Sequence, residues 1–254
     1  MAYLRLAYRI PWLLFLAFIG TPVVVLCQYR PFSNWRFGRR SLDGIMAAWW
    51  GHTICRIFGL RLSVRGAMPP GPQLLVANHI SWIDIPVLQS VATVGFVSKD
   101  EIRKWPVIGF LAKAGKTVFL ERGNRASADG VTGAMEDRLR AGGNVAIFPE
   151  GGILPGPGVK RFHGRLFAAA IHTGAPVQPV MLRYMVDGKH DDGMTFLPGE
   201  NFVANFIRLF MQAPRDTEVE VLPRLESTHR RRRDLAAEAE AAVREAYEAG
   251  PLRD

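Results

Sequence analysis

The chain has 254 residues, of which 48% are hydrophobic, and it carries a formal net charge of +9. This length and composition supply enough apolar side chains for one full core, as in a single α/β domain with a short appendage. They argue against a disulfide framework or a zinc site, because the only two cysteines, Cys27 and Cys55, lie far from the polar clusters described below. A reducing, cytoplasmic setting fits this cysteine content.

The positive charge is concentrated at the N-terminal end of the chain. Residues 1–66 contain nine arginines and a single acid, Asp43, so almost all of the net charge lies there. These arginines alternate with apolar runs of membrane length and do not cover one polar face. Membrane lipids are therefore the expected partner of this charge, and nucleic acid is not.

The first apolar run, Ile10–Gln28, contains 19 residues without a charge, which is just long enough to span a bilayer. A cleaved signal peptide is the alternative, but no small-x-small cleavage site follows the run. Pro11, Gly20 and Pro22 would kink a straight helix, so both a spanning and a re-entrant anchor stay open. We expect an anchor in the cytoplasmic (inner) membrane, with the rest of the chain facing the cytoplasm.

A second apolar stretch, Ile45–Leu60, has helical spacing and contains Trp49 and Trp50. Tryptophan favours the boundary between hydrocarbon and water, so this helix could lie at the membrane interface. An ordinary core helix fits the same pattern. The expected organisation is an anchor with an interfacial helix over residues 1–59, followed by a catalytic domain over residues 60–254.

From residue 60 onward, short β-like runs alternate with helical stretches, which predicts an α/β fold: a mostly parallel central sheet flanked by helices. The predicted strands are Leu60–Val64, Gln73–Ala77, Val94–Ser98, Thr117–Leu120, Val145–Phe148, Val177–Tyr184 and Val219–Leu222. The predicted helices are Trp105–Ala114, Ser127–Ala141, Arg165–His172 and Asp234–Ala249.

Three of these strands end in polar residues. In open α/β sheets, ligands bind beyond the carboxyl ends of the strands, so these positions are candidates for a site. They are Asn78-His79, Glu121-Arg122 and the segment Pro149–Gly152.

His79 and Asp84 can form a base and its orienting carboxylate. An imidazole with a pKa near 6.5 can take a proton from an alcohol, and a carboxylate on its other nitrogen fixes the tautomer. Five residues of a regular helix turn through about 500°, which would separate the two side chains. The pairing therefore requires His79 to lie outside the helix that carries Asp84, and Asn78 and Ser81 suit such a loop.

Four ordered blocks then resemble the glycerolipid acyltransferase family, which includes 1-acylglycerol-3-phosphate acyltransferase. Asn78-His79 followed by Asp84 resembles the first block. The later blocks are Phe119–Arg122, Phe148–Gly151 and Val177–Val180, in the family's order. Together they cover about residues 75–185.

The resemblance implies a role for particular residues. Arg122 would hold the phosphate of the acceptor, with Phe119 supporting that block. Pro179 would shape the pocket. Glu150 and Gly151 would bind substrate in the third block beside Pro149, and backbone amides near Gly151 could stabilise an oxyanion.

The third block departs from the family pattern, which commonly continues Thr-Arg-Ser. This chain continues Gly152-Ile153-Leu154, so a usual arginine is missing. Lys160 and Arg161 follow shortly afterwards and could replace its charge, although a solvated loop would explain them equally well.

The implied activity is transfer of a fatty acyl group to the free hydroxyl of a lysophospholipid, with 1-acylglycerol-3-phosphate as the first choice of acceptor. The acyl donor would be acyl-CoA or acyl carrier protein as a co-substrate, with no cofactor and no metal. A lyso-ornithine lipid is the alternative acceptor. A lipid hydrolase and a non-enzymatic lipid-binding protein are further alternatives, and the absence of a Gly-x-Ser-x-Gly elbow argues against a serine hydrolase.

Overall fold

The computed structural model describes residues 2–38, 40–99, 118–120, 125–153 and 158–251. Its centre is a mostly parallel sheet with strand order β3-β10-β8-β4-β7-β5-β6, and β9 pairs with the end of β8. Among the described strands of this sheet, the antiparallel pairs are β10 with β8 and β8 with β9. The strands are β3 (Leu60–Arg65), β4 (Leu74–Ala77), β5 (Val94–Lys99), β6 (Val118–Leu120), β7 (Asn144–Ile147), β8 (Val177–Val186), β9 (Lys189–His190) and β10 (Arg215–Val221).

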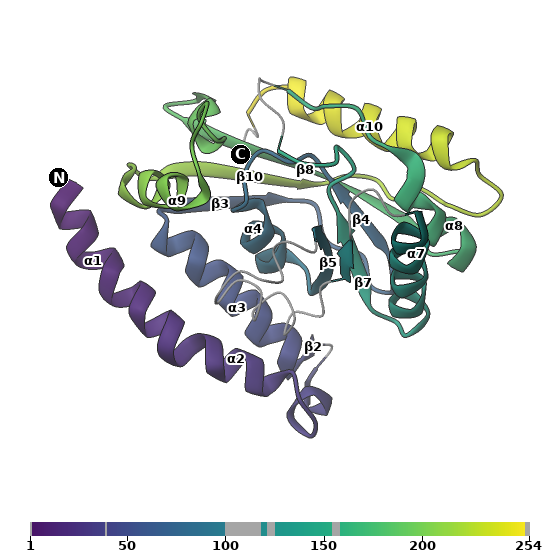
Figure 1. The fold of residues 1–254 in the computed structure, drawn as a ribbon, viewed down its shortest axis with the longest axis horizontal. Helices are drawn as coiled ribbons and strands as arrows, with labels where there is room; N and C mark the ends of the chain where they lie inside the picture. Colours follow the sequence, from purple (N-terminus) through teal and green to yellow (C-terminus); the bar gives the residue numbers. More distant parts are fainter. Residues whose placement is uncertain (1, 39, 100–117, 121–124, 154–157, 252–254) are drawn as a thin grey trace.

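Helices cover both faces of the sheet (Figure 1). The helices α3 (Leu42–Ile57), α4 (Asp84–Val91) and α9 (Phe202–Met211) contribute to one hydrophobic cluster. The other cluster contains residues of α7 (Arg125–Arg140), α8 (Ala168–Thr173) and α10 (Arg232–Glu248). Strand β8 contributes to both clusters, because Leu182 and Tyr184 belong to the first and Val177 and Met181 to the second. Alternate side chains of a strand point to opposite faces, and β8 is buried on both.

The N-terminal helix runs beside this domain as α1 (Ala2–Phe15), a π-helical turn η1 (Leu16–Gly20) and α2 (Thr21–Cys27). The 25 residues Tyr3–Cys27 are long and apolar enough to cross a membrane, judged by length and composition. The π-turn ends two residues before Pro22, which cannot donate a backbone hydrogen bond, and α1, the turn and α2 follow one another as one continuous helix (Figure 1). This apolar helix is a candidate membrane anchor.

Helix α3 joins the anchor to the domain. Its residues Ile54, Cys55 and Ile57 are buried in the core, whereas Trp49 is 38% exposed. Gly51 allows α3 to approach α4 closely, because a Cβ atom there would lie 2.6 Å from the carbonyl oxygen of Pro86. The helix predicted at Ile45–Leu60 is therefore largely a core helix. The division at residue 59 stays a prediction.

The predicted α/β architecture with its mostly parallel sheet is confirmed. Strand β10 begins at Arg215, four residues before its predicted start. Helix α9 was not predicted, and the helix predicted at Trp105–Ala114 lies outside the described residues. Smaller elements complete the chain: η2 (Phe32–Asn34), β1 (Arg36–Phe37), β2 (Arg40–Ser41), η3 (Gly164–Phe167) and η4 (Asp192–Met194).

A buried ion pair fixes β8 against β10. Arg183 lies opposite Glu218 in the antiparallel register, and its Nε donates to Oε2 of Glu218 at 2.7 Å. Its Nη1 also donates to the carbonyl oxygen of Tyr247 in α10 at 2.8 Å. The Arg183 side chain is fully buried, so these bonds compensate for the loss of its hydration.

We predict that Arg183→Met lowers the free energy of unfolding by about 3 kcal/mol, because the Glu218 carboxylate stays buried without its guanidinium partner. The double variant Arg183→Met with Glu218→Leu should recover most of this loss. Denaturant unfolding of the full chain in detergent measures both. A single variant as stable as the wild type would show that the pair contributes nothing to the fold.

Candidate active site

The site begins where β4 ends. Asn78 follows the four buried apolar residues of β4 and is itself only 2% exposed. Its side-chain Nδ2 donates to the carbonyl oxygen of Leu182 at 2.8 Å, and the Leu182 amide donates to its Oδ1 at 2.8 Å. The side chain thus replaces the strand-to-strand hydrogen bonds one position beyond the pair Ala77 and Val180. This attaches the loop that carries His79 to β8.

Asp84 is the first residue of α4, and its side chain is fully buried. Its Oδ2 accepts hydrogen bonds from the backbone amides of Ile80 at 2.7 Å and Ser81 at 2.9 Å, and lies 2.9 Å from Nδ1 of His79. Its Oδ1 accepts from the hydroxyl of Tyr184 at 2.6 Å. The loop is therefore folded around this one carboxylate.

His79 lies outside helix α4, as the predicted pairing with Asp84 required. A carboxylate oxygen only accepts, so the Nδ1 atom of His79 is assigned as the donor. In the neutral ring, the Nε2 atom then keeps its lone pair and can accept a proton from a substrate.

The ring of His79 stacks on Phe148, with centroids 3.9 Å apart and planes inclined by 11°. Phe148 directly follows β7, so the first and third sequence blocks meet at this contact. The His79 side chain is 12% exposed, so most of the ring is enclosed while an edge stays accessible. Packing against Phe148 therefore restricts the orientation of the imidazole plane.

Glu150 ties the same two blocks together. It is 4% exposed, and its Oε1 accepts from the backbone amide of Lys160 at 3.1 Å. Burial raises the pKa of the Glu150 carboxyl, while hydrogen bonds from the backbone amides of Lys160 and His79 oppose this rise. The carboxyl group therefore joins the backbone at His79 to the backbone at Lys160.

Gly151 and Gly152 form the sharp turn after Glu150, with φ angles of +82° and +156°. A residue with a Cβ atom would be strained at both positions. The Gly151 amide donates to the carbonyl oxygen of Phe148 at 3.2 Å, so it holds the turn in this structure. An oxyanion role for this amide stays a prediction.

The other predicted binding residues lie in different surroundings. Lys160 is half-buried near Glu150, whereas Arg161 is exposed. Buried Pro149 accepts a hydrogen bond from the amide of His163, and Pro179 lies inside β8 opposite Val76 of β4. Arg122 lies outside the described residues, as does the side chain of Phe119 in β6, so their roles stay predictions.

Sequence reasoning missed Tyr184. Burial raises the pKa of its hydroxyl well above the ordinary value and the Asp84 charge raises it further, so the hydroxyl stays protonated and donates to Asp84. Tyr184 was expected at the end of a strand. Nothing in the spacing of the sequence links it to Asp84, a hundred positions earlier.

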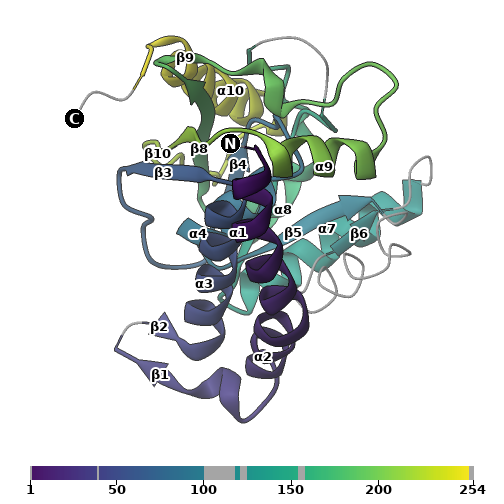
Figure 2. The ribbon, with the colours of Figure 1, turned by 90° about the vertical axis from the view of Figure 1, so that its left-hand side faces the viewer.

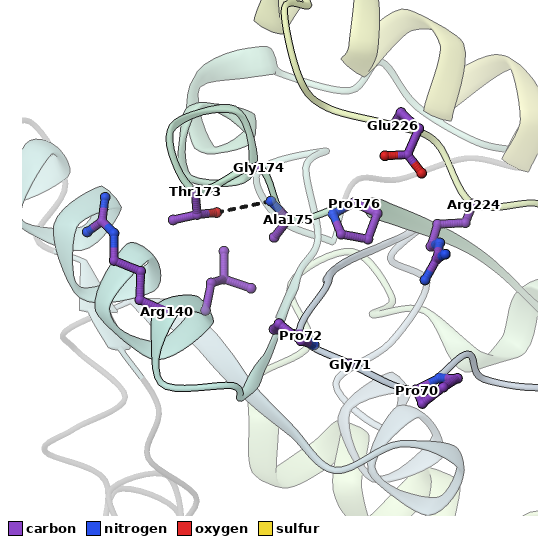
Figure 3. Close-up of a pocket in the computed structure, with 11 residues that line it drawn as sticks. Pro70, Gly71, Pro72, Arg140, Thr173, Gly174, Ala175, Pro176, Arg224 and Glu226 are labelled. Atoms are coloured by element: carbon purple, nitrogen blue, oxygen red, sulfur yellow. Dashed lines mark hydrogen bonds between the residues drawn. The ribbon is translucent and has the colours of Figure 1, made fainter.

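A cavity of about 330 Å³ lies at the other end of the central strands from His79 (Figure 3). Its lining includes Pro72, just before β4, and Pro176, just before β8, so it adjoins the amino ends of these strands. His79 follows the carboxyl end of β4. This cavity is therefore separate from the candidate site. Among the described residues, no group of three acidic, histidine or cysteine side chains is placed to hold a metal ion.

Comparison of the chain with known proteins identifies its family. Residues 61–183 match the acyltransferase family. The chain is 36% identical to a lyso-ornithine lipid O-acyltransferase of Pseudomonas aeruginosa over 199 residues, which are 78% of this chain and 77% of the relative. The chain belongs to the acyltransferase family. The matched region of this acyltransferase contains His79, Asp84 and Glu150.

Two further proteins define the range of similarity. A 1-acyl-sn-glycerol-3-phosphate acyltransferase of Neisseria gonorrhoeae is 37% identical over 126 residues, which are 50% of this chain and 49% of that relative. The crystal structure of the 1-acyl-sn-glycerophosphate acyltransferase PlsC from Thermotoga maritima matches the whole of both chains with a TM-score of 0.72 at 19% identity. The structural match shows that this acyltransferase shares the PlsC fold.

We predict that Tyr184→Phe lowers kcat roughly 10-fold while the KM for the acceptor stays the same. The variant removes one donor to the Asp84 carboxylate without changing the volume of the core, so the orientation of His79 loosens. Steady-state kinetics with a pH profile measure the effect, and thermal unfolding serves as the control. An unchanged kcat and pH profile would show that Tyr184 only fills space.

Glu150→Gln should change how stability depends on pH. A raised carboxyl pKa means that the folded state binds the proton more tightly than the unfolded state, so wild-type stability falls as pH rises from the ordinary value of 4.5. Glutamine keeps an acceptor oxygen for the amide of Lys160 and does not titrate. The variant should therefore gain stability relative to the wild type as the pH rises above about 4.5. Unfolding curves that stay parallel over this range would contradict this.

Proposed function

We propose that His79 acts as the general base that activates the hydroxyl of a lysolipid for attack on an acyl thioester. The arrangement that carries this proposal is the contact between Nδ1 of His79 and the buried carboxylate of Asp84. This contact fixes the tautomer with the proton on Nδ1, so that Nε2 is directed away from Asp84 and is the atom that can accept a proton.

The proposed reaction needs no enzyme-bound intermediate. The Nε2 atom of His79 removes the hydroxyl proton while the hydroxyl oxygen attacks the thioester carbonyl carbon. The tetrahedral oxyanion collapses, the carbon–sulfur bond breaks, and the thiolate leaves and takes up the proton. The acyl donor is acyl-CoA or acyl carrier protein as a co-substrate, and positioning of the two substrates supplies much of the rate.

We propose a lyso-ornithine lipid as the acceptor. The Pseudomonas relative with that name is similar over most of this chain, whereas the Neisseria relative is similar over half of it. The third block supports this choice, because it continues Gly152-Ile153-Leu154 and lacks the arginine that is common in the family. A lyso-ornithine lipid carries a carboxylate and an amine, so its recognition requires fewer cations than that of a phosphate dianion.

A second candidate acceptor is 1-acylglycerol-3-phosphate, which would give phosphatidic acid. The Neisseria relative favours it, as does Arg122 in the second block, whose charge could hold the phosphate. Lys160 and Arg161 would then supply the missing positive charge of the third block. Both acceptors are membrane lipids, in agreement with an anchor in the cytoplasmic membrane and a catalytic domain on its cytoplasmic side.

The test supplies the detergent-solubilised full chain with an acyl thioester and either lyso-ornithine lipid or 1-acylglycerol-3-phosphate. Thiol release and acylated lipid are followed in parallel. We expect equal amounts of thiol and acylated product, with lyso-ornithine lipid used at least 10-fold more efficiently.

His79→Ala should lower this activity by a factor of about 10² to 10⁴, which is the usual contribution of a general base. The control is His172→Ala, because His172 is exposed on α8 and pairs with Glu136 far from the site. Activity that survives in His79→Ala would exclude the base mechanism. Thiol release without acylated lipid would indicate hydrolysis, and lipid binding without either product would indicate a lipid-binding protein.

A further inference from the structure

Helix α9 exposes an apolar stripe although its other face is buried. Val203, Ile207 and Met211 are spaced four residues apart, so they lie along one side of the helix, and they are 64%, 51% and 38% exposed. The opposite side buries Asn205 and Leu209. An apolar stripe of this kind on a helix of a lipid-handling protein requires a partner.

The end of this stripe lies next to the N-terminal helix. Arg9 of α1 is 3% exposed, and its Nη1 donates to the carbonyl oxygens of Phe210 and Gln212 at the end of α9. Arg5 donates to the carbonyl oxygen of Met211. Figure 2 looks onto the side of the molecule where α1 and α9 lie next to each other.

The outer side of the N-terminal helix is itself strongly apolar. Leu4, Tyr8 and Phe18 are 76%, 62% and 76% exposed. Whatever surrounds this helix therefore also reaches the neighbouring α9. The hydrocarbon of a bilayer fits both surfaces at once.

The inner side of α9 contacts the loop from Asn78 to Asp84, which carries His79 and is called the catalytic loop below. The indole Nε1 of Trp82 donates to Oδ1 of Asn205 at 2.9 Å, and Asn205 is fully buried. Trp82 also stacks on Phe206, with centroids 5.7 Å apart, and makes an edge contact with Phe202. Trp82 lies three residues after His79 in the same loop, so α9 packs directly against the loop that presents the base.

We propose that α9 is a second membrane contact, which rests in the interface of the bilayer that holds the N-terminal helix. It places the catalytic loop at the lipid surface, so that a lysolipid acceptor reaches His79 while its acyl chain stays among the membrane lipids. This second part rests on the proposed function. Val203, Ile207 and Met211 by themselves form too small an area for a stable interface with a second copy of the chain, whereas a bilayer around the N-terminal helix would cover them as well.

Spin-label depth measurements test the membrane contact without any assay of activity. The full chain is reconstituted in vesicles of phosphatidylethanolamine and phosphatidylglycerol. Cys27 is replaced by serine, and Cys55 is fully buried and stays unlabelled. Nitroxides are attached at Ile207→Cys, at Phe18→Cys as a membrane reference, and at Val64→Cys on β3 as an equally exposed control outside the stripe.

We expect the label at position 207 to collide more often with oxygen than with a water-soluble nickel chelate, as at position 18. The label at position 64 should show the reverse. A label at position 207 that behaves like the one at position 64 would overturn the proposal. Spin–spin broadening at position 207 would also overturn it, because it would identify a second copy of the chain as the partner.

Activity then tests the consequence for the acceptor. Ile207→Glu should lower the rate with acceptor embedded in vesicles about 10-fold relative to the rate with a short-chain acceptor dispersed in water. The matched change Val64→Glu should leave this ratio as in the wild type. Equal ratios in both variants would refute the delivery of acceptor through α9. Inactivity of the wild type with every acceptor would refute the proposed function and leave the spin-label result standing.

Discussion

The Asp84 carboxylate accepts hydrogen bonds from two backbone amides, the Tyr184 hydroxyl and the His79 ring, and the loop from Asn78 to Asp84 is built around it. An ionised group without water is costly unless donors satisfy it, so this loop has one arrangement that is strongly preferred. The same bonds that make the buried charge tolerable also fix the imidazole. In this acyltransferase, the stability of the loop and the orientation of the proposed base therefore depend on the same hydrogen bonds.

Strand β8 supplies the fixed frame for that loop. Its backbone at Leu182 holds Asn78, and its Tyr184 side chain holds Asp84 from the same face. Between them, Arg183 turns to the other face and joins β8 to β10 and α10. Because alternate residues of the strand point to opposite faces of the sheet, hydrogen bonds hold β8 in place on both faces. The frame is thus held by hydrogen bonds within the protein itself.

The sequence was sufficient for the α/β sheet and for the pairing of His79 with Asp84, because strand periodicity and the spacing of five residues are local patterns. It was also sufficient to require His79 outside the helix, which follows from helix geometry alone. Tyr184 and α9 could not be found in this way. Tyr184 reaches Asp84 only through the pairing of β4 with β8, and the apolar residues of α9 look like core residues until the neighbouring N-terminal helix is placed.

The account rests on the tautomer of His79, since only a ring with its proton on Nδ1 leaves Nε2 free to act as a base. Nitrogen NMR of the full chain with ¹⁵N-labelled histidine in detergent, assigned by comparison with His79→Gln, reports this directly. At a pH where the ring is neutral, the account predicts a protonated Nδ1 with a strong hydrogen bond and an unprotonated Nε2. The opposite tautomer, with the proton on Nε2, would contradict the account.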